Sequence, residues 1–258
     1  MKYELTNESM INAVGNKLFR IKALVDIEEY GVKAGDLGGW IEKKKNLRQD
    51  GDAWVSGNAQ VYDDAQVYDD AHVFGNAQVY CSAQVYGDAC VSGAAQVYGD
   101  ACVSGAAQVY DDACVSGAAQ VYDEAWVSGD ACISGYAWIY GDAKVYGNAK
   151  VSGAAQVYGD ACVSGDAYIC DNIQVYDTAQ VYGAAKVYDD AKISGNAKVF
   201  GNAQVSGATQ VSGNAQVSGA AKIFGAAEVY GAAEVSGAAQ IYGNAQVSKI
   251  IEDGGING

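Results

Sequence analysis

The chain has 258 residues, half of them apolar, and a formal net charge of −15. It has no run of about 18 apolar residues, which excludes a membrane-spanning helix, and its few Lys and Arg argue against binding nucleic acid through phosphate neutralisation. Seven cysteines without a CxxC or CxxH motif predict neither a disulfide framework nor a zinc site, and the absence of an apolar signal segment predicts a cytoplasmic protein.

The first 50 residues have no repeating pattern. Residues 3–5 and 18–24 have the composition of strands, with a turn near Gly15 and Asn16, and residues 42–45 form a charged linker. Because an open solenoid end would expose unpaired backbone, we expect residues 1–50 to form an N-terminal cap and linker that carries Trp40.

Residues 51–248, 198 in number, divide without interruption into 33 units of the form G-[ND]-A-x-V-[YS]. The fifth position is Val or Ile in every unit, and the third is Ala except at Ile173 and Thr209. In an extended segment these two positions face one side, whereas positions four and six face the other. Each unit is therefore predicted to be a short strand with an apolar inner face, followed by a Gly, Asn or Asp corner.

One such strand cannot bury its inner face alone, so the units must coil and stack. Three strands per coil give 18 residues per turn and about 11 coils, which predicts an all-β, triangular, parallel β-solenoid over residues 51–248. Residues 249–258 are predicted to be a short tail that covers the other end only in part.

The unit at residues 61–66 (V-Y-D-D-A-Q) resembles the hexapeptide repeat of left-handed β-helix proteins, and left-handedness is what this resemblance implies. The segments 18–24 (LFRIKAL) and 35–41 (GDLGGWI) resemble the N-terminus of YdcK-like bacterial and phage solenoids. This resemblance implies a bacterial or phage protein. No activity follows from its motifs.

An enzymatic alternative comes from the same architecture, because many left-handed β-helix proteins resemble trimeric acyltransferases that use a His as general base. His72, the only histidine, occupies an outward fourth position beside Asp69 and Asp70, which could raise its pKa. The repeat has no inserted loop to build a pocket, however, so we expect no catalytic residue and keep His72 as the weak candidate.

Acidic residues recur at one corner of the repeat. Residues 18 apart should stack, which aligns Asp52, Asp70, Asp88, Glu124, Asp142 and Asp160. Such a column could hold hard cations, but Asp also suits the corner backbone, so we expect neither metal nor cofactor. Residues 51–140 contain 12 acidic residues and no Lys or Arg, which suggests, as a further alternative, an acidic mimic that sequesters a basic host factor.

Outward aromatic residues define the preferred candidate surface. On one side of the predicted solenoid the aligned residues are Tyr68, Tyr86, Tyr122, Trp138, Tyr140, Tyr158 and Tyr176, accompanied by Gln. Tyr and Trp combine large contact area with a polar group and are enriched at interfaces, although Tyr also has a high β propensity. The sequence therefore favours a non-enzymatic structural or binding protein, whose ladders contact a protein partner or a second copy in a homo-oligomer.

Overall fold

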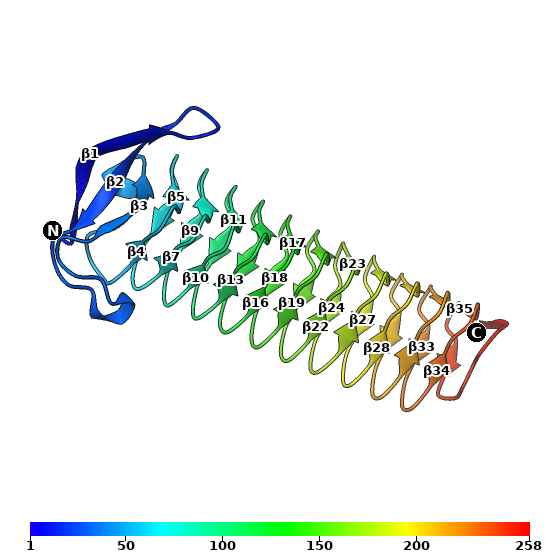
Figure 1. Cartoon of the computed structure of the whole chain (residues 1–258). Helices are drawn as coiled ribbons and strands as arrows, with labels where there is room; N and C mark the ends of the chain where they lie inside the picture. Colours follow the sequence, from blue (N-terminus) through cyan, green and yellow to red (C-terminus); the bar gives the residue numbers. More distant parts are fainter. The chain divides into compact units, whose positions relative to one another are not determined.

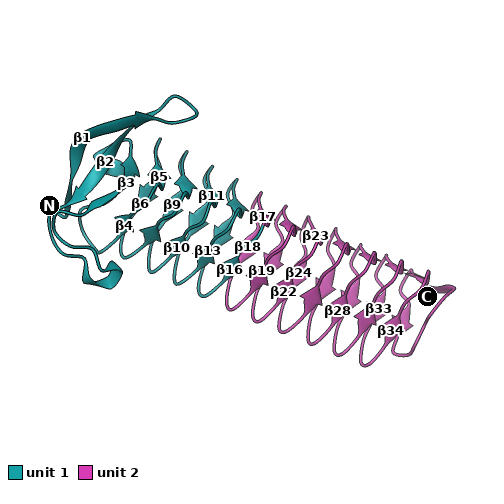
Figure 2. Ribbon diagram, viewed as in Figure 1, with its two compact units in different colours: residues 1–129 teal, residues 130–258 magenta.

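The computed structural model describes residues 1–258 and divides into two compact units, residues 1–129 and 130–258 (Figure 2). Apart from two short 3-10 helices, every regular element is a β-strand (Figure 1). Each unit is a parallel β-solenoid, in which successive two-residue strands belong in turn to three sheets, here called the first, second and third walls.

The strands of the N-terminal unit pair with the strand one turn later. Cys90 pairs with Gln108 and Gln96 with Cys114, which confirms the predicted turn of 18 residues. The first wall contains β5 (Gln60–Val61), β8 (Gln78–Val79), β11 (Gln96–Val97) and β14 (Cys114–Val115). The second wall contains β4 (Trp54–Val55), β7 (His72–Val73), β10 (Cys90–Val91), β13 (Gln108–Val109) and β16 (Trp126–Val127). The third wall contains β6 (Gln66–Val67), β9 (Gln84–Val85), β12 (Cys102–Val103) and β15 (Gln120–Val121).

The C-terminal unit repeats this arrangement. Its first wall contains β17 (Cys132–Ile133), β20 (Lys150–Val151), β23 (Tyr168–Ile169), β26 (Lys186–Val187), β29 (Gln204–Val205), β32 (Lys222–Ile223), β35 (Gln240–Tyr242) and β37 (Gly255–Asn257). Its second wall contains β19 (Lys144–Val145), β22 (Cys162–Val163), β25 (Gln180–Val181), β28 (Lys198–Val199), β31 (Gln216–Val217) and β34 (Glu234–Val235). Its third wall contains β18 (Trp138–Ile139), β21 (Gln156–Val157), β24 (Gln174–Val175), β27 (Lys192–Ile193), β30 (Gln210–Val211), β33 (Glu228–Val229) and β36 (Gln246–Val247).

The core of each unit is the stack of third and fifth repeat positions. The Ala and the Val or Ile at these positions are buried, as predicted from side-chain alternation. Ile173 replaces Ala and is fully buried. Thr209 is also buried, and its hydroxyl donates to the Ser206 carbonyl at 2.6 Å. The local acceptor keeps this polar atom satisfied inside an apolar column.

The corners require a left-handed backbone at the first repeat position. Gly219 has φ +66°, and a Cβ there would lie 2.9 Å from the Gly237 carbonyl oxygen one turn later. Where Asp takes this position it also has positive φ, as at Asp177. The Asp177 carboxylate accepts a hydrogen bond from the Gly195 N–H at 3.0 Å. Asp therefore offsets its backbone strain by binding a corner N–H of the next coil.

The N-terminal cap is an antiparallel sheet that extends the first wall. It contains β1 (Tyr3–Ile11), β2 (Lys17–Ala23) and β3 (Leu37–Ile41), with the 3-10 helices η1 (Glu28–Tyr30) and η2 (Lys44–Asn46). Trp40 packs in the cap against Leu18 and Tyr62. In β3, Ile41 pairs with Val61, so the solenoid wall begins within the segment expected to be cap and linker, with a first turn longer than the repeat.

The C-terminal tail continues the solenoid in part. Ile251 forms a parallel bridge with Val235, and β37 pairs with β35. Its side chains no longer follow the repeat, yet its backbone occupies the edges of the last coils.

Candidate functional site

Stacked tyrosine rings are the most regular outward feature of both units. On the third wall of the C-terminal unit, the rings of Tyr140 and Tyr158 are 4.9 Å apart and within 4° of parallel, and Tyr176 continues the stack at 5.1 Å. In the N-terminal unit, Tyr68 and Tyr86 stack at 4.9 Å. This spacing is that of adjacent strands, because residues one turn apart lie directly above one another.

A glutamine one coil later anchors several of these rings. The Tyr68 hydroxyl donates to Gln84 Oε1 at 2.9 Å, and Tyr80 donates to Gln96 Oε1 at 3.2 Å. Each acceptor lies 16 residues after its tyrosine, at the fourth repeat position of the next coil. The hydrogen bond fixes the tilt of the ring, so the ladder is a row of pre-oriented aromatic edges.

The predicted ladder is not confined to one wall. Tyr62, Tyr80 and Tyr98 stack on the first wall of the N-terminal unit, where desolvation raises the pKa of Tyr62 and of Tyr80 to about 12. Tyr182 and Phe200 stack on the second wall of the C-terminal unit. Every wall that places an aromatic residue at the sixth position in consecutive coils forms such a stack.

The third wall of the C-terminal unit is nevertheless distinctive. Its first strand carries Trp138, which is 40% exposed, next to Tyr140. The outward residues from Trp138 to Tyr176 on this wall are Trp, Tyr and Gln only, without a charged side chain. Tyr122, also predicted for this surface, follows β15 in the N-terminal unit and is half-buried.

His72 lies beneath the cap and is not presented to solvent as an ordinary outward residue. The Tyr30 ring of η1 stacks on it at 4.3 Å, Phe74 lies at 4.6 Å, and Ser56 Oγ is 2.9 Å from His72 Nε2. Burial lowers the pKa of His72 to about 4. The expectation that acidic neighbours raise this pKa is therefore wrong, because desolvation by the cap dominates.

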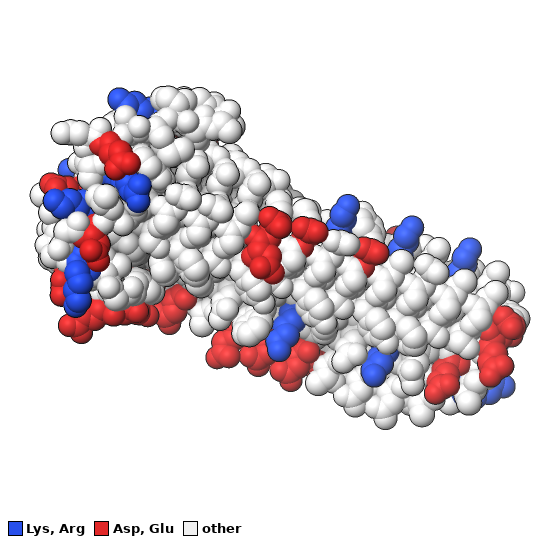
Figure 3. Space-filling model, in the orientation of Figure 1, with Lys and Arg blue, Asp and Glu red and all other residues white.

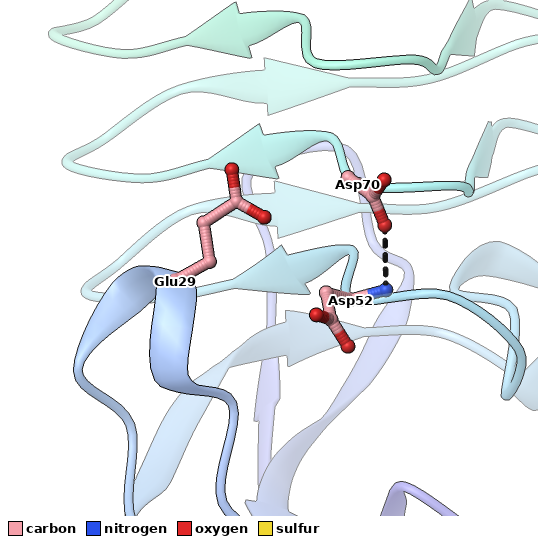
Figure 4. A group of neighbouring side chains, drawn as sticks. All are labelled: Glu29, Asp52 and Asp70. Carbon is pink, nitrogen blue, oxygen red and sulfur yellow. Dashed lines mark hydrogen bonds between the residues drawn. The ribbon is translucent and has the colours of Figure 1, made fainter.

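Three carboxylates meet beside this cap. Oxygens of Glu29, Asp52 and Asp70 lie within 4.8 Å of one another, and Asp70 Oδ1 also accepts the Asp52 N–H at 3.0 Å (Figure 4). Desolvation, and then the negative charges of Asp70 and Asp88, raise the pKa of Glu29. The sequence predicted the pair Asp52 and Asp70, but Glu29 comes from the cap, so only the fold could place it there.

The other members of the acidic column are simple surface groups. Asp88 in the N-terminal unit and Asp142 and Asp160 in the C-terminal unit are exposed. Figure 3 shows carboxylates gathered along one edge of the N-terminal unit.

A surface hollow that sequence reasoning missed lies on the first wall of the C-terminal unit. Its volume is about 530 Å³, and Lys150, Tyr168 and Lys186 line it from successive strands, with Cys170 beside them. It exists because Ser152 and Cys170 replace the tyrosine of the sixth position. Burial and the neighbouring Asp171 carboxylate raise the pKa of the Cys170 thiol to about 11, so this thiol is a poor nucleophile at neutral pH.

Comparison with known families identifies the repeat. The family model described as the YdcK beta solenoid repeat matches residues 65–80, 83–99, 107–123 and 155–171. With the parallel β-solenoid fold, these matches make the chain a YdcK-like solenoid repeat protein. No curated protein matches the chain. The structure also has no helix that is both long and apolar enough to span a bilayer.

Proposed function

We propose that this protein is a non-enzymatic binding element that associates through the third wall of its C-terminal unit. The interface consists of Trp138, Tyr140, Tyr158 and Tyr176 with the intervening glutamines. The observation that carries this proposal is the pre-oriented aromatic stack, which has a constant ring spacing and no charged side chain. Rigid aromatic surfaces lose little conformational entropy on binding.

The occupant we propose is a second copy of the chain. A second copy carries the same wall with the same strand spacing, so each contact can be repeated from coil to coil in a self-complementary interface. The net charge of −15 makes two copies repel each other over most of their surface. An uncharged wall is where this repulsion is weakest and where desolvation costs least.

The test is the replacement of both Tyr140 and Tyr158 by Lys, with mass in solution measured by light scattering over a range of protein concentrations. We expect the wild-type protein to associate and this variant to be monomeric. The matched control replaces Tyr182 and Phe200 by Lys, because these rings form an equivalent stack on the second wall of the same unit. The control should associate like the wild type.

Two outcomes would contradict the proposal. If Tyr140→Lys with Tyr158→Lys leaves association unchanged, the third wall is not the interface. If the wild type is monomeric at every concentration, the second copy is excluded as occupant, and a different protein partner becomes the explanation to test.

The acyltransferase alternative draws no support from the site geometry. A general base must reach a proton on its substrate, whereas Tyr30 covers the ring of His72. Retention of acetyl transfer after His72→Ala would remove this alternative entirely. The acidic-mimic alternative predicts strongly salt-dependent binding of a basic protein to the N-terminal unit.

A further inference from the structure

Two hollows in the N-terminal unit have the same construction. In each, a serine at the sixth repeat position stands between an aromatic residue one coil before it and another one coil after it. On the second wall Ser92 lies between Phe74 and Tyr110, in a hollow of about 240 Å³. On the third wall Ser104 lies between Tyr86 and Tyr122, in a hollow of about 250 Å³.

The size of each gap is that of one aromatic ring. Neighbouring rings of a continuous ladder are 4.9 Å apart, so rings two coils apart are separated by about 9.6 Å, twice the strand spacing. A planar ring inserted between Tyr86 and Tyr122 restores the spacing of the ladder. It stacks on an aromatic ring on each side, and the small Ser104 side chain leaves its place open.

The ladder also specifies a hydrogen-bond partner for the inserted ring. Tyr68 and Tyr80 donate to the glutamine 16 residues later. The residue 16 positions after Ser92 is Gln108, and the residue 16 positions after Ser104 is Gln120. Each glutamine lines its hollow. Each hollow therefore offers both the stacking faces and the amide acceptor that a tyrosine at the serine position would use.

The Tyr86 ring follows the same diagonal rule. Its hydroxyl interacts with Cys102, 16 residues later, and with Ser104, and the bond to Cys102 is the main cause that raises the pKa of Tyr86. The first ring of the third-wall hollow thus has the tilt of the continuous ladder. Its stacking face is oriented before any ligand arrives.

Charge at the rim favours some substituents over others. Asp111 lines the second-wall hollow and Asp123 the third-wall hollow. Together with the overall net charge of −15, these carboxylates disfavour an anionic ligand and favour a cationic or neutral one.

We propose that these two hollows bind small phenols that carry a neutral or cationic substituent. The phenol ring lies between the two flanking aromatic rings, and its hydroxyl donates to Gln108 or Gln120. This inference is independent of the proposed association, because it uses interruptions of the ladder in the N-terminal unit.

The test is the binding of tyramine to the full-length protein, measured by isothermal titration calorimetry and by saturation-transfer NMR. We expect saturable binding of one tyramine per hollow. Phenethylamine, which lacks the hydroxyl, should bind about fivefold more weakly, as expected for the loss of one hydrogen bond of about 1 kcal/mol. 4-Hydroxyphenylacetate, with the opposite charge, and 2-cyclohexylethylamine, without a planar ring, should also bind more weakly than tyramine.

Matched variants locate the binding. Ser92→Tyr with Ser104→Tyr fills both gaps with the residue that the ladder uses elsewhere and should abolish tyramine binding. Ser92→Ala with Ser104→Ala keeps the gaps open and should bind as the wild type does. Circular dichroism and thermal unfolding confirm the fold of each variant.

A second pair of variants keeps the proposal testable if the tyrosine variant fails to fold. Gln108→Leu with Gln120→Leu should reduce tyramine affinity to that of phenethylamine in the wild type, while phenethylamine affinity stays unchanged. The proposal is overturned by the absence of saturable tyramine binding in the millimolar range, by equal affinity for tyramine and 2-cyclohexylethylamine, or by a folded tyrosine variant that binds as the wild type does.

Discussion

The contact between the cap and the second wall makes a quantitative prediction about His72. The ring of His72 stacks on Tyr30 at 4.3 Å and lies 2.9 Å from Ser56 Oγ, and this half-buried environment lowers its pKa to about 4 from an ordinary 6.5. The informative substitution is His72→Gln, because Gln is the commonest residue at the fourth repeat position and does not titrate.

The sign follows from which state binds the proton more readily. A depressed pKa in the folded state means that the unfolded chain takes up the proton first, so stability is present above pH 6.5 and is lost as the pH falls toward 4. A difference of one in pKa corresponds to about 1.4 kcal/mol, which sets an upper limit of about 3 kcal/mol for the full shift. Because solvent still reaches part of the ring, we expect about 1 kcal/mol to be lost between pH 7 and pH 5.

Hydrogen exchange measured by mass spectrometry on peptides covering η1 and β7 reports this local opening. The difference in opening free energy between the wild type and His72→Gln is compared at pH 7 and at pH 5, which cancels the pH dependence of intrinsic exchange. We expect the wild type to lose stability relative to the variant at pH 5. A difference that is the same at both pH values would refute the burial of His72 by the cap.

Three further substitutions test the corners, the core and the cap. Gly231→Ala and Gly219→Ala both place a Cβ at φ +66°, but only the second meets backbone within 4 Å, at 2.9 Å. Urea unfolding should therefore show a cost of about 1 kcal/mol for the first and a clearly larger one for the second. Val157→Ala removes two methyl groups from a fully buried position and should cost about 2 kcal/mol in the same assay. Tyr3→Phe removes a hydroxyl that donates to the Leu47 carbonyl at 2.7 Å, so the N-terminal segment should become about tenfold more sensitive to limited proteolysis. Burial raises the pKa of Tyr3 to about 12, so its stabilising effect, present below pH 10, should fall as the pH rises toward 12 in the wild type but not in this variant.

The repeat allowed the wall structure to be predicted almost residue by residue. A six-residue period with alternating inward positions leaves one way to bury Ala and Val, and a turn of 18 residues places Tyr140 above Tyr158 before any coordinates are known. The tyrosine ladders were predictable for the same reason. The ring-sized gaps at Ser92 and Ser104 follow from the same register, but the hydrogen bonds from tyrosine to glutamine that give those gaps their chemistry depend on the tilt of each ring.

The surroundings of His72 could not be predicted, because they depend on a segment outside the repeat. Nothing in the periodicity places Tyr30 over His72 or Glu29 beside Asp52, since η1 reaches the second wall only through the folding of the cap. The same limit applies to β3, whose pairing with β5 departs from the 18-residue register.

The sequence by itself determined the inward face, the corners and the alignment of residues one turn apart, because each depends only on side-chain alternation and a constant period. The tertiary structure decided the contacts between the cap and the repeat and the sign of the His72 pKa shift. Those depend on desolvation by residues far away in the chain, and a local pattern carries no information about which surface a distant segment will cover.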